Sequence, residues 1–226
     1  MLHCTMALSP RGGRARLAAI DSDRTKGARL SQLDESDSGI LDASKSGGVH
    51  GGANFSIKHR VFRGVWNLVW LILASWTPPP LHGWRRFLLR LFGAKLGTEA
   101  RVYGSARIWY PPNLEMGDYS VLGWKVNCYS QGKITLGRYV VVSQYSHLVS
   151  GTHEIDDPSF QLYTRPIVIG DNAWVASDAF VGPGVTVGEG AVLGARAVAF
   201  KNLDPWMVYV GNPARPARPR KRFTRP

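Results

Sequence analysis

The feature that most constrains the fold is an apolar residue at every sixth position over residues 169–203. One series of such positions begins at Ile169 and a second begins at Ala173. The first series is Ile169, Val175, Val181, Val187, Leu193 and Ala199, and the second is Ala173, Ala179, Val185, Ala191, Ala197 and Leu203. A six-residue period fits neither one face of a helix nor the alternation of a strand. It marks a repeat architecture, which decides the whole fold.

A six-residue unit is too short to bury an apolar face alone, but stacked coils bury one continuous core. We therefore expect each unit to be one short strand plus a corner, with three units to a coil of a triangular prism. Glycine follows the larger apolar residue in several units, and we expect it to supply backbone conformations that a Cβ atom opposes. These glycines are Gly170, Gly182, Gly188 and Gly194.

The same pattern recurs upstream in three less regular blocks. Slips of two residues separate the blocks, near Leu114 and near Ile134. A larger interruption, "SGTHEIDDPSFQLYTRP" (150–166), precedes the regular part. The upstream apolar positions are Leu96, Val102, Ile108, Met116, Leu122, Cys128, Leu136, Val142 and Leu148.

The pattern [LIV]-G-x-x-x-x over residues 96–204 resembles the hexapeptide-repeat acyltransferases. Within that family, "LHGWRRFLLRLFGAKLG" (81–97), "GTHEIDDPSF" (151–160) and "VGNPARP" (210–216) are similar to colanic-acid biosynthesis acetyltransferases. The resemblance covers about residues 60–219. It implies a mainly β protein with a left-handed parallel β-helix, and it implies a homotrimer with the active site between two subunits. It also implies a CoA-dependent O-acetyltransferase that modifies a sugar hydroxyl in surface-polysaccharide biosynthesis.

Outside the repeat, the chain divides into three further segments. Residues 1–55 are rich in Ser, Gly and Asp without periodicity, so we expect disorder, or else a stretch upstream of the true start of translation. Residues 56–95 are expected to be helical, 96–204 to form the β-helix, and 205–226 to be a basic tail.

The helical segment contains two candidate helices. The first, "IKHRVFRGVWNLVWLILASW" (57–76), has a charge-free stretch of residues 64–76 that is too short to cross a bilayer. The prolines of "TPPP" end it, and the second, "GWRRFLLRLFG" (83–93), is amphipathic and basic. Two roles stay open and are compatible: a cap on the open end of the prism, or attachment to a membrane surface.

Charge and cysteine content exclude several other classes. The net charge of +12 is partly due to the C-terminal "NPARPARPRKRFTRP". No aromatic-stacking or groove-reading module accompanies it, so we expect no nucleic-acid partner. Cys4 and Cys128 form neither a disulfide framework nor a metal-binding spacing, and Cys128 occupies an inward repeat position, where we expect a buried thiol. We expect no metal and a cytoplasmic protein, with the inner face of the cytoplasmic membrane as an alternative.

Acyl transfer to a hydroxyl requires a base near neutral pH, which favours histidine. His153 lies in the long interruption, where the resemblance to galactoside and maltose acetyltransferases implies the catalytic base. His147 ends a repeat unit and could support the site, although a structural role is favoured. The acidic residues Glu154, Asp156 and Asp157 either orient the imidazole or are ordinary solvated loop residues.

The resemblance also implies residues for acetyl-CoA and for the acceptor. Ser177 and Ala195 match positions whose main chain contacts the pantetheine arm, and Lys201 and Arg215 match basic positions near the CoA phosphates. The alternative for each is an ordinary corner residue or surface charge. Two further positions match the acceptor side of the family's site, Asn127 and Trp174.

Two other functions remain open at this stage. A γ-class carbonic anhydrase shares the prism but needs three histidines around zinc, whereas only His147 and His153 lie in the repeat region. A scaffold without catalytic activity needs neither the Thr-His pair nor the basic C-terminal coil. The sequence favours the acetyltransferase over both.

Overall fold

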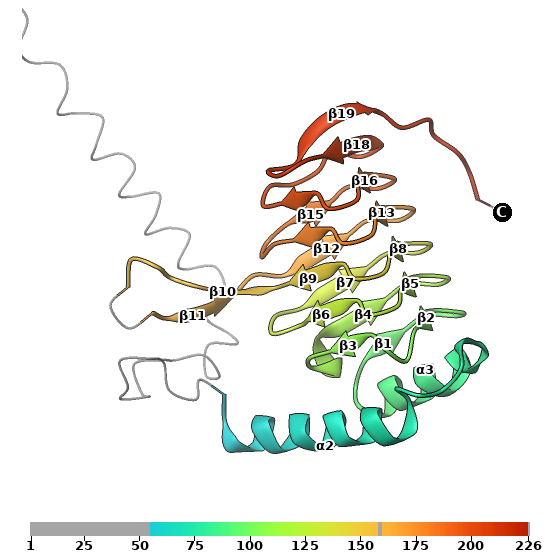
Figure 1. Ribbon diagram of the computed structural model, residues 1–226, viewed down its shortest axis with the longest axis vertical. Helices are drawn as coiled ribbons and strands as arrows, with labels where there is room; N and C mark the ends of the chain where they lie inside the picture. Colours follow the sequence, from blue (N-terminus) through green and yellow to red (C-terminus); the bar gives the residue numbers. More distant parts are fainter. Residues whose placement is uncertain (1–54, 158–159, 226) are drawn as a thin grey trace, which may run out of the picture. The chain divides into compact units, whose positions relative to one another are not determined.

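The computed structural model describes residues 55–157 and 160–225. The expectations for residues 1–54 lie outside the described residues. Those described belong to one compact unit, Leu41–Pro226, in which two helices precede a β-solenoid (Figure 1).

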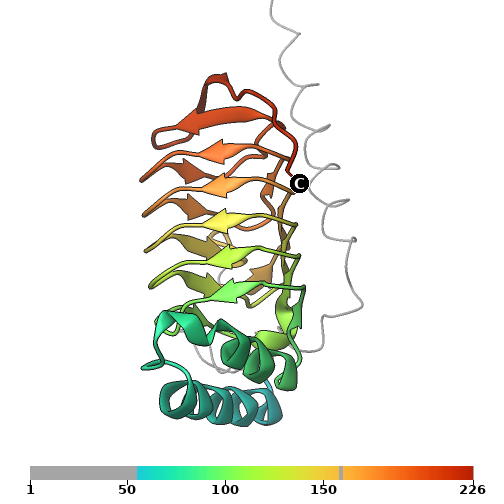
Figure 2. The same cartoon turned by 90° about the vertical axis from the view of Figure 1, so that its right-hand side faces the viewer.

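Short parallel strands stack into three sheets that form the faces of a prism (Figures 1 and 2). Sheet A contains, in stacking order, β1 (Lys95–Leu96), β4 (Leu114–Met116), β7 (Ile134–Leu136), β12 (Ile167–Ile169) and β15 (Thr186–Val187). Sheet B contains β2 (Arg101–Val102), β5 (Val121–Leu122), β8 (Val141–Val142), β13 (Trp174–Val175), β16 (Val192–Leu193), β18 (Met207–Val210) and β19 (Arg215–Pro219). Sheet C contains β3 (Arg107–Ile108), β6 (Asn127–Tyr129), β9 (His147–Val149), β14 (Phe180–Val181) and β17 (Val198–Ala199). The predicted fold class, a parallel β-helix of hexapeptide repeats, is confirmed.

The repeat positions fill the prism as predicted. All twelve apolar positions of the two series between 169 and 203 are buried, as are the nine upstream positions. Cys128 is among them, and its burial raises the thiol pKa to about 12. The two predicted slips correspond to extra residues at the corner before sheet A, where the short helix η4 (Pro111–Asn113) forms the first insertion.

The glycines that follow the apolar positions are needed for space and not for an unusual backbone conformation. A Cβ atom at Gly170 would lie 2.7 Å from the backbone nitrogen of Glu189 on the next coil, and one at Gly117 would lie 2.7 Å from that of Arg138. Left-handed backbone occurs instead at the corners, where residues such as Asn172 (φ 60°) and Asp178 (φ 62°) occupy it. Our expectation that these repeat glycines supply special backbone angles was therefore wrong.

The interruption forms an arm that projects from the prism after β9 (Figure 1). Its strands β10 (Gly151–His153) and β11 (Leu162–Thr164) pair in antiparallel register, with His153 opposite Leu162. The arm leaves and re-enters at the corner between sheets C and A, so the coils on either side stack without a break.

Helix α2 (Ile57–Leu73) lies across the first coil and is fixed there by two indoles (Figure 1). Trp66 Nε1 donates to the carbonyl of Ile108 at 2.8 Å, and Trp70 Nε1 donates to that of Gly104 at 3.0 Å. The helix begins after Ser56, whose hydroxyl accepts the backbone N–H of His59 at 3.2 Å.

A short turn, η3 (Pro79–Leu81), leads into α3 (His82–Leu91), which packs on the first coil through Leu88 and Leu89. Arg85 is fully buried between α3 and the coil. It donates to the carbonyls of Val102 at 2.6 Å and Pro79 at 2.7 Å, so backbone carbonyls satisfy it without a carboxylate. None of the helices in the described segments is both long and apolar enough to span a membrane.

At the opposite end, part of the segment expected as a tail belongs to the fold. β18 adds a parallel strand to sheet B, and β19 turns back antiparallel to it. Arg220 then donates to the carbonyls of Asn172 at 3.0 Å and Gly190 at 2.9 Å, which holds the following chain against the prism.

Candidate active site

His153 ends the first strand of the arm, and its imidazole is held from one side. Nδ1 lies 2.8 Å from the backbone carbonyl of Phe160, and the two rings stack with centroids 4.3 Å apart. A carbonyl oxygen only accepts, so Nδ1 carries the proton, and in the neutral imidazole Nε2 is then the unprotonated nitrogen. This is the tautomer that a general base requires.

The loop of the arm is organised by its backbone. Glu154 N donates to the carbonyl of Gln161 at 2.8 Å, and Phe160 N donates to that of Asp157 at 2.8 Å. The acidic residues were expected either to orient the imidazole or to be ordinary solvated loop residues. At Nδ1, the group that orients the imidazole is the Phe160 carbonyl. Glu154 and Asp156 are exposed to solvent.

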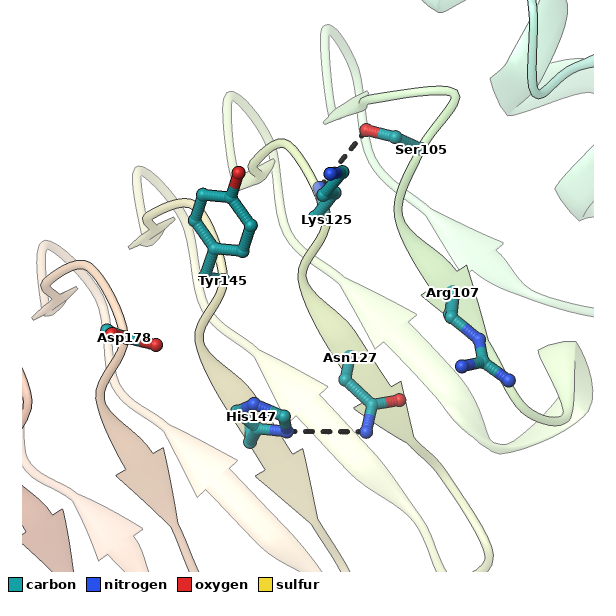
Figure 3. Close-up of a pocket in the computed structure, with 7 residues that line it drawn as sticks. All are labelled: Ser105, Arg107, Lys125, Asn127, Tyr145, His147 and Asp178. Atoms are coloured by element: carbon teal, nitrogen blue, oxygen red, sulfur yellow. Dashed lines mark hydrogen bonds between the residues drawn. The ribbon is translucent and has the colours of Figure 1, made fainter.

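A second cluster lies on the outer face of sheet C, where an open pocket of about 440 Å³ contains Asn127 and His147. Asn127 Nδ2 is 3.4 Å from His147 Nδ1, and the two are register partners on β6 and β9 (Figure 3). The pocket is lined by Ser105, Arg107, Lys125, Asn127, Tyr145, His147 and Asp178. The structure therefore brings the predicted acceptor residue Asn127 together with His147, for which the sequence favoured a structural role over support of the site.

The other lining residues were missed, although the sequence carried a signal for them. The first two coils contain 20 residues each, because each corner insertion adds two residues to three hexads. Positions 107, 127 and 147 therefore fall in one column of sheet C, with Arg107 paired to Asn127 and Asn127 to His147. Positions 105, 125 and 145 form the adjoining corner, where Ser105 Oγ accepts the backbone N–H of Lys125 at 3.1 Å (Figure 3).

The pocket has a positive charge balance. Arg107 and Lys125 contribute two cations, and the single carboxylate, Asp178, pairs with Arg196 at 3.3 Å. Lys125 Nζ also lies 4.4 Å from the ring centroid of Trp124. Such a site suits a hydroxyl-rich ligand that carries negative charge.

Within one chain, the predicted acceptor and catalytic residues are separate. Trp174 lies on the outer face of sheet B, where its indole donates to Ser143 Oγ at 2.9 Å. His153 follows His147 by six residues of nearly continuous strand, a path of up to about 20 Å. In the described residues, neither a hydrogen bond nor a ring contact joins His153 to Asn127 or Trp174.

The residues predicted to contact pantetheine share one corner of the prism. Ser177 and Ala195 occupy the corner between sheets B and C on successive coils, and Arg196 N donates to the Ser177 carbonyl at 3.0 Å. This corner continues upward from the pocket, because Asp178 lines the pocket and directly follows Ser177.

The predicted phosphate ligands are both exposed on the last coils, one on a strand and the other at a corner. Arg215 begins β19 opposite Val210, whereas Lys201 follows β17 at the corner leading to Leu203. Among the described residues, no cluster of three or more His, Cys, Asp or Glu side chains has a geometry for holding a metal ion.

Comparisons with known proteins agree with this architecture. The family model "Bacterial transferase hexapeptide (six repeats)" matches residues 166–199. WcaF of Escherichia coli K12, assigned as an acetyltransferase of colanic acid biosynthesis, is 46% identical over 150 residues, which cover 66% of this chain and 82% of WcaF.

Two solved structures share the fold at lower identity. The maltose O-acetyltransferase of Clostridium difficile 630 superposes with a TM-score of 0.63 at 23% identity, covering 74% of this chain and 90% of that one. The hexapeptide-repeat acetyltransferase VCA0836 of Vibrio cholerae, in complex with acetyl-CoA, superposes with a TM-score of 0.67 at 22% identity, covering 74% and 91%. The identity to WcaF over most of its length, with which the stacked coils agree, shows that this chain belongs to the family of hexapeptide-repeat acetyltransferases that includes WcaF.

Proposed function

We propose that this protein transfers an acetyl group from acetyl-CoA to a sugar hydroxyl in the biosynthesis of a surface polysaccharide, with His153 as the general base. The observation that carries the proposal is the 46% identity to WcaF over 82% of its length. The arm supports it, because it presents one histidine in the tautomer that the reaction needs.

In the proposed reaction, Nε2 of His153 removes the proton of the acceptor hydroxyl as its oxygen attacks the thioester carbonyl. The C–S bond breaks, and CoA leaves as a thiolate that takes a proton back from the imidazolium. The Phe160 carbonyl accepts a hydrogen bond from Nδ1–H throughout, so the ring keeps its orientation while its charge changes.

We place acetyl-CoA along the corner between sheets B and C. Its pantetheine would contact the main chain at Ser177 and Ala195, and its phosphates would lie near Lys201 and Arg215. Exposed cations at this end of the prism support that orientation, since phosphate groups are bound by charge-assisted hydrogen bonds.

We further propose that the protein is a homotrimer in which each site combines two subunits. Asn127 and its pocket would hold the acceptor on one subunit, and the arm of a neighbouring subunit would supply His153. The separation of these residues within one chain supports this arrangement, because each alone lacks the other's chemistry. Trp174 would complete the wall of the same site.

The central test is His153→Ala, with thiol release from acetyl-CoA measured against a panel of free sugars, nucleotide sugars and lipid-linked oligosaccharides. We expect kcat to fall by about 10²–10⁴-fold while the KM for acetyl-CoA changes little. The matched control is His147→Ala, which should cost less activity. A folded His153→Ala enzyme with normal turnover would exclude His153 as the base.

The shared site is tested by subunit complementation. His153→Ala and Asn127→Ala subunits are each expected to have strongly reduced activity. Mixed trimers contain some interfaces with an intact Asn127 and an intact His153, so activity should reappear on mixing. Absence of recovery in trimers proved to be mixed would place both residues in one subunit's site.

A further inference from the structure

Helix α2 has a continuous apolar face that points away from the protein. Five residues at helical spacing form this face, and between 49% and 76% of each side chain is exposed. They are Ile57, Val61, Val65, Leu68 and Ile72. We refer to these five residues as the basal stripe. A continuous apolar helix face of this kind normally packs against another part of the protein, a partner or a membrane.

The helix cannot turn the basal stripe inward. Its opposite face is anchored by Trp66 and Trp70, whose indoles donate to carbonyls of the first coil. Both rings are buried, and they lie 5.0 Å apart. The stripe is therefore fixed outward, opposite the two anchored rings. Helix α2 itself lies at the end of the prism, beyond the first coil (Figure 1).

Helix α3 adds a second exposed apolar group beside the end of α2. Trp84, Phe87 and Leu91 are spaced along one face of α3, and Trp84 Nε1 donates to the carbonyl of Leu73 at 2.7 Å. The indole of Trp76, which is 72% exposed, donates to the carbonyl of Ile72 at 2.5 Å.

Of the 22 exposed large apolar side chains in the described residues, 12 lie between Ile57 and Leu91. The concentration at one end of the molecule is therefore not the ordinary scatter of surface hydrophobes.

The charged residues of the helical segment itself are all of one sign. Residues 55–95 contain seven Lys or Arg residues and no Asp or Glu. Lys58 and Arg60 are exposed and flank the basal stripe on opposite sides of α2. Arg90 near the end of α3 is also exposed, and its guanidinium donates to the carbonyl of Leu96 at 2.6 Å. Arg85 is not available to a ligand, because it is buried and fully bonded to carbonyls. An apolar stripe between cations is complementary to an anionic, amphiphilic surface.

We propose that the basal stripe and the exposed face of α3 dock in the interfacial layer of an anionic lipid bilayer, with α2 lying in the membrane plane. The apolar side chains would enter the acyl boundary, and the cations would meet lipid phosphates. Indoles favour this interface, since each has an apolar body and a polar N–H. A second copy fits less well, because two such faces would bring like charges together.

The test is flotation of the full chain with vesicles of phosphatidylcholine, with and without phosphatidylglycerol. We expect the protein to float with the anionic vesicles and much less with the neutral ones. The paired change Val61→Gln and Leu68→Gln should weaken binding by at least about 10-fold, whereas Asn67→Gln, on the flank of the same helix, should leave it unchanged. All three side chains are exposed, so thermal unfolding should confirm that each variant is folded.

Lys58→Gln with Arg60→Gln should abolish most of the preference for anionic vesicles. The proposal is overturned if the full chain fails to float with anionic vesicles, or if the Val61/Leu68 variant floats as well as the parent. It is also overturned if that variant lowers the molar mass in light scattering, because the stripe would then join copies of the chain. Flotation needs no acetyl transfer, so these outcomes are independent of the proposed function.

Discussion

His153 and Phe160 are joined twice across the loop of the arm, by a hydrogen bond of 2.8 Å from Nδ1 to the backbone carbonyl and by stacking of the two rings at 4.3 Å. The hydrogen bond fixes the tautomer and the stacking fixes the plane of the ring. Both partners of the imidazole thus come from one residue, seven positions along the chain.

The first prediction separates these two contributions. Phe160→Ala keeps the backbone carbonyl but removes the stacking, so Nε2 should stay unprotonated while the ring becomes less well positioned. We expect kcat to fall by up to about 10²-fold, less than in His153→Ala. Phe160→Tyr, which keeps the stacked ring, is the control and should retain most of the activity. Equal rates for Phe160→Ala and the parent would show that the stacking does not position the base.

The second prediction concerns acetyl-CoA. Lys201→Ala and Arg215→Ala should each raise the KM for acetyl-CoA, by about 1–3 kcal/mol in binding free energy for a lost charge-assisted bond. Arg218→Ala, another exposed arginine of β19, provides the matched control. Steady-state kinetics measure all three, and unchanged KM values for both Lys201→Ala and Arg215→Ala would remove these residues from the cofactor site.

The third prediction tests the packing of the coils. A methyl group at Gly170 would lie 2.7 Å from the backbone nitrogen of Glu189, and neither backbone can move without separating two coils. We expect Gly170→Ala to cost about 1–3 kcal/mol of unfolding free energy. Gly64 in α2 has no neighbour within 4 Å of a Cβ position, so Gly64→Ala should stabilise by up to about 1 kcal/mol. Denaturant unfolding measures the unfolding free energy of both variants. If Gly170→Ala is as stable as the parent, the coils tolerate the extra methyl group and the prediction is wrong.

The fourth prediction concerns Cys128. Burial raises its pKa to about 12, so the thiol stays protonated, and therefore unreactive, at any pH near neutrality. In a Cys4→Ser background, we expect no labelling by a thiol reagent in the native protein and stoichiometric labelling after unfolding. Rapid labelling of the native protein would mean that the second coil, which contains β6 and Cys128, opens.

The prism could be predicted from the sequence because its physical cause is periodic. Each inward position repeats every six residues, and burial of Val175, Val181 and Val187 follows from that spacing alone. The function of the repeat glycines could not be derived, because it depends on how closely the next coil approaches Gly170. A single sequence shows the period of a repeat but not the distance between its layers.

The candidate site was predictable only in part. His153 could be found because it interrupts a pattern, and Asn127 through family resemblance. Arg107, Lys125 and Tyr145 were missed, since they are brought together by coil length and carry no local motif. The roles of the predicted residues stay predictions until the variants are measured.

The last strands of the solenoid have a consequence for whether copies of the molecule can stack end to end. A stack of parallel strands can elongate indefinitely, because every exposed edge offers hydrogen-bonding groups to another strand. Here the last parallel strand, β18, has the uncharged sequence "MVYV", and β19 covers it with "RPARP". Pro216 and Pro219 have no N–H to offer, and Arg215 and Arg218 repel a copy of the same edge. A chain shortened before β19 would expose β18 as a template, and we expect such a truncation to assemble end to end into fibres.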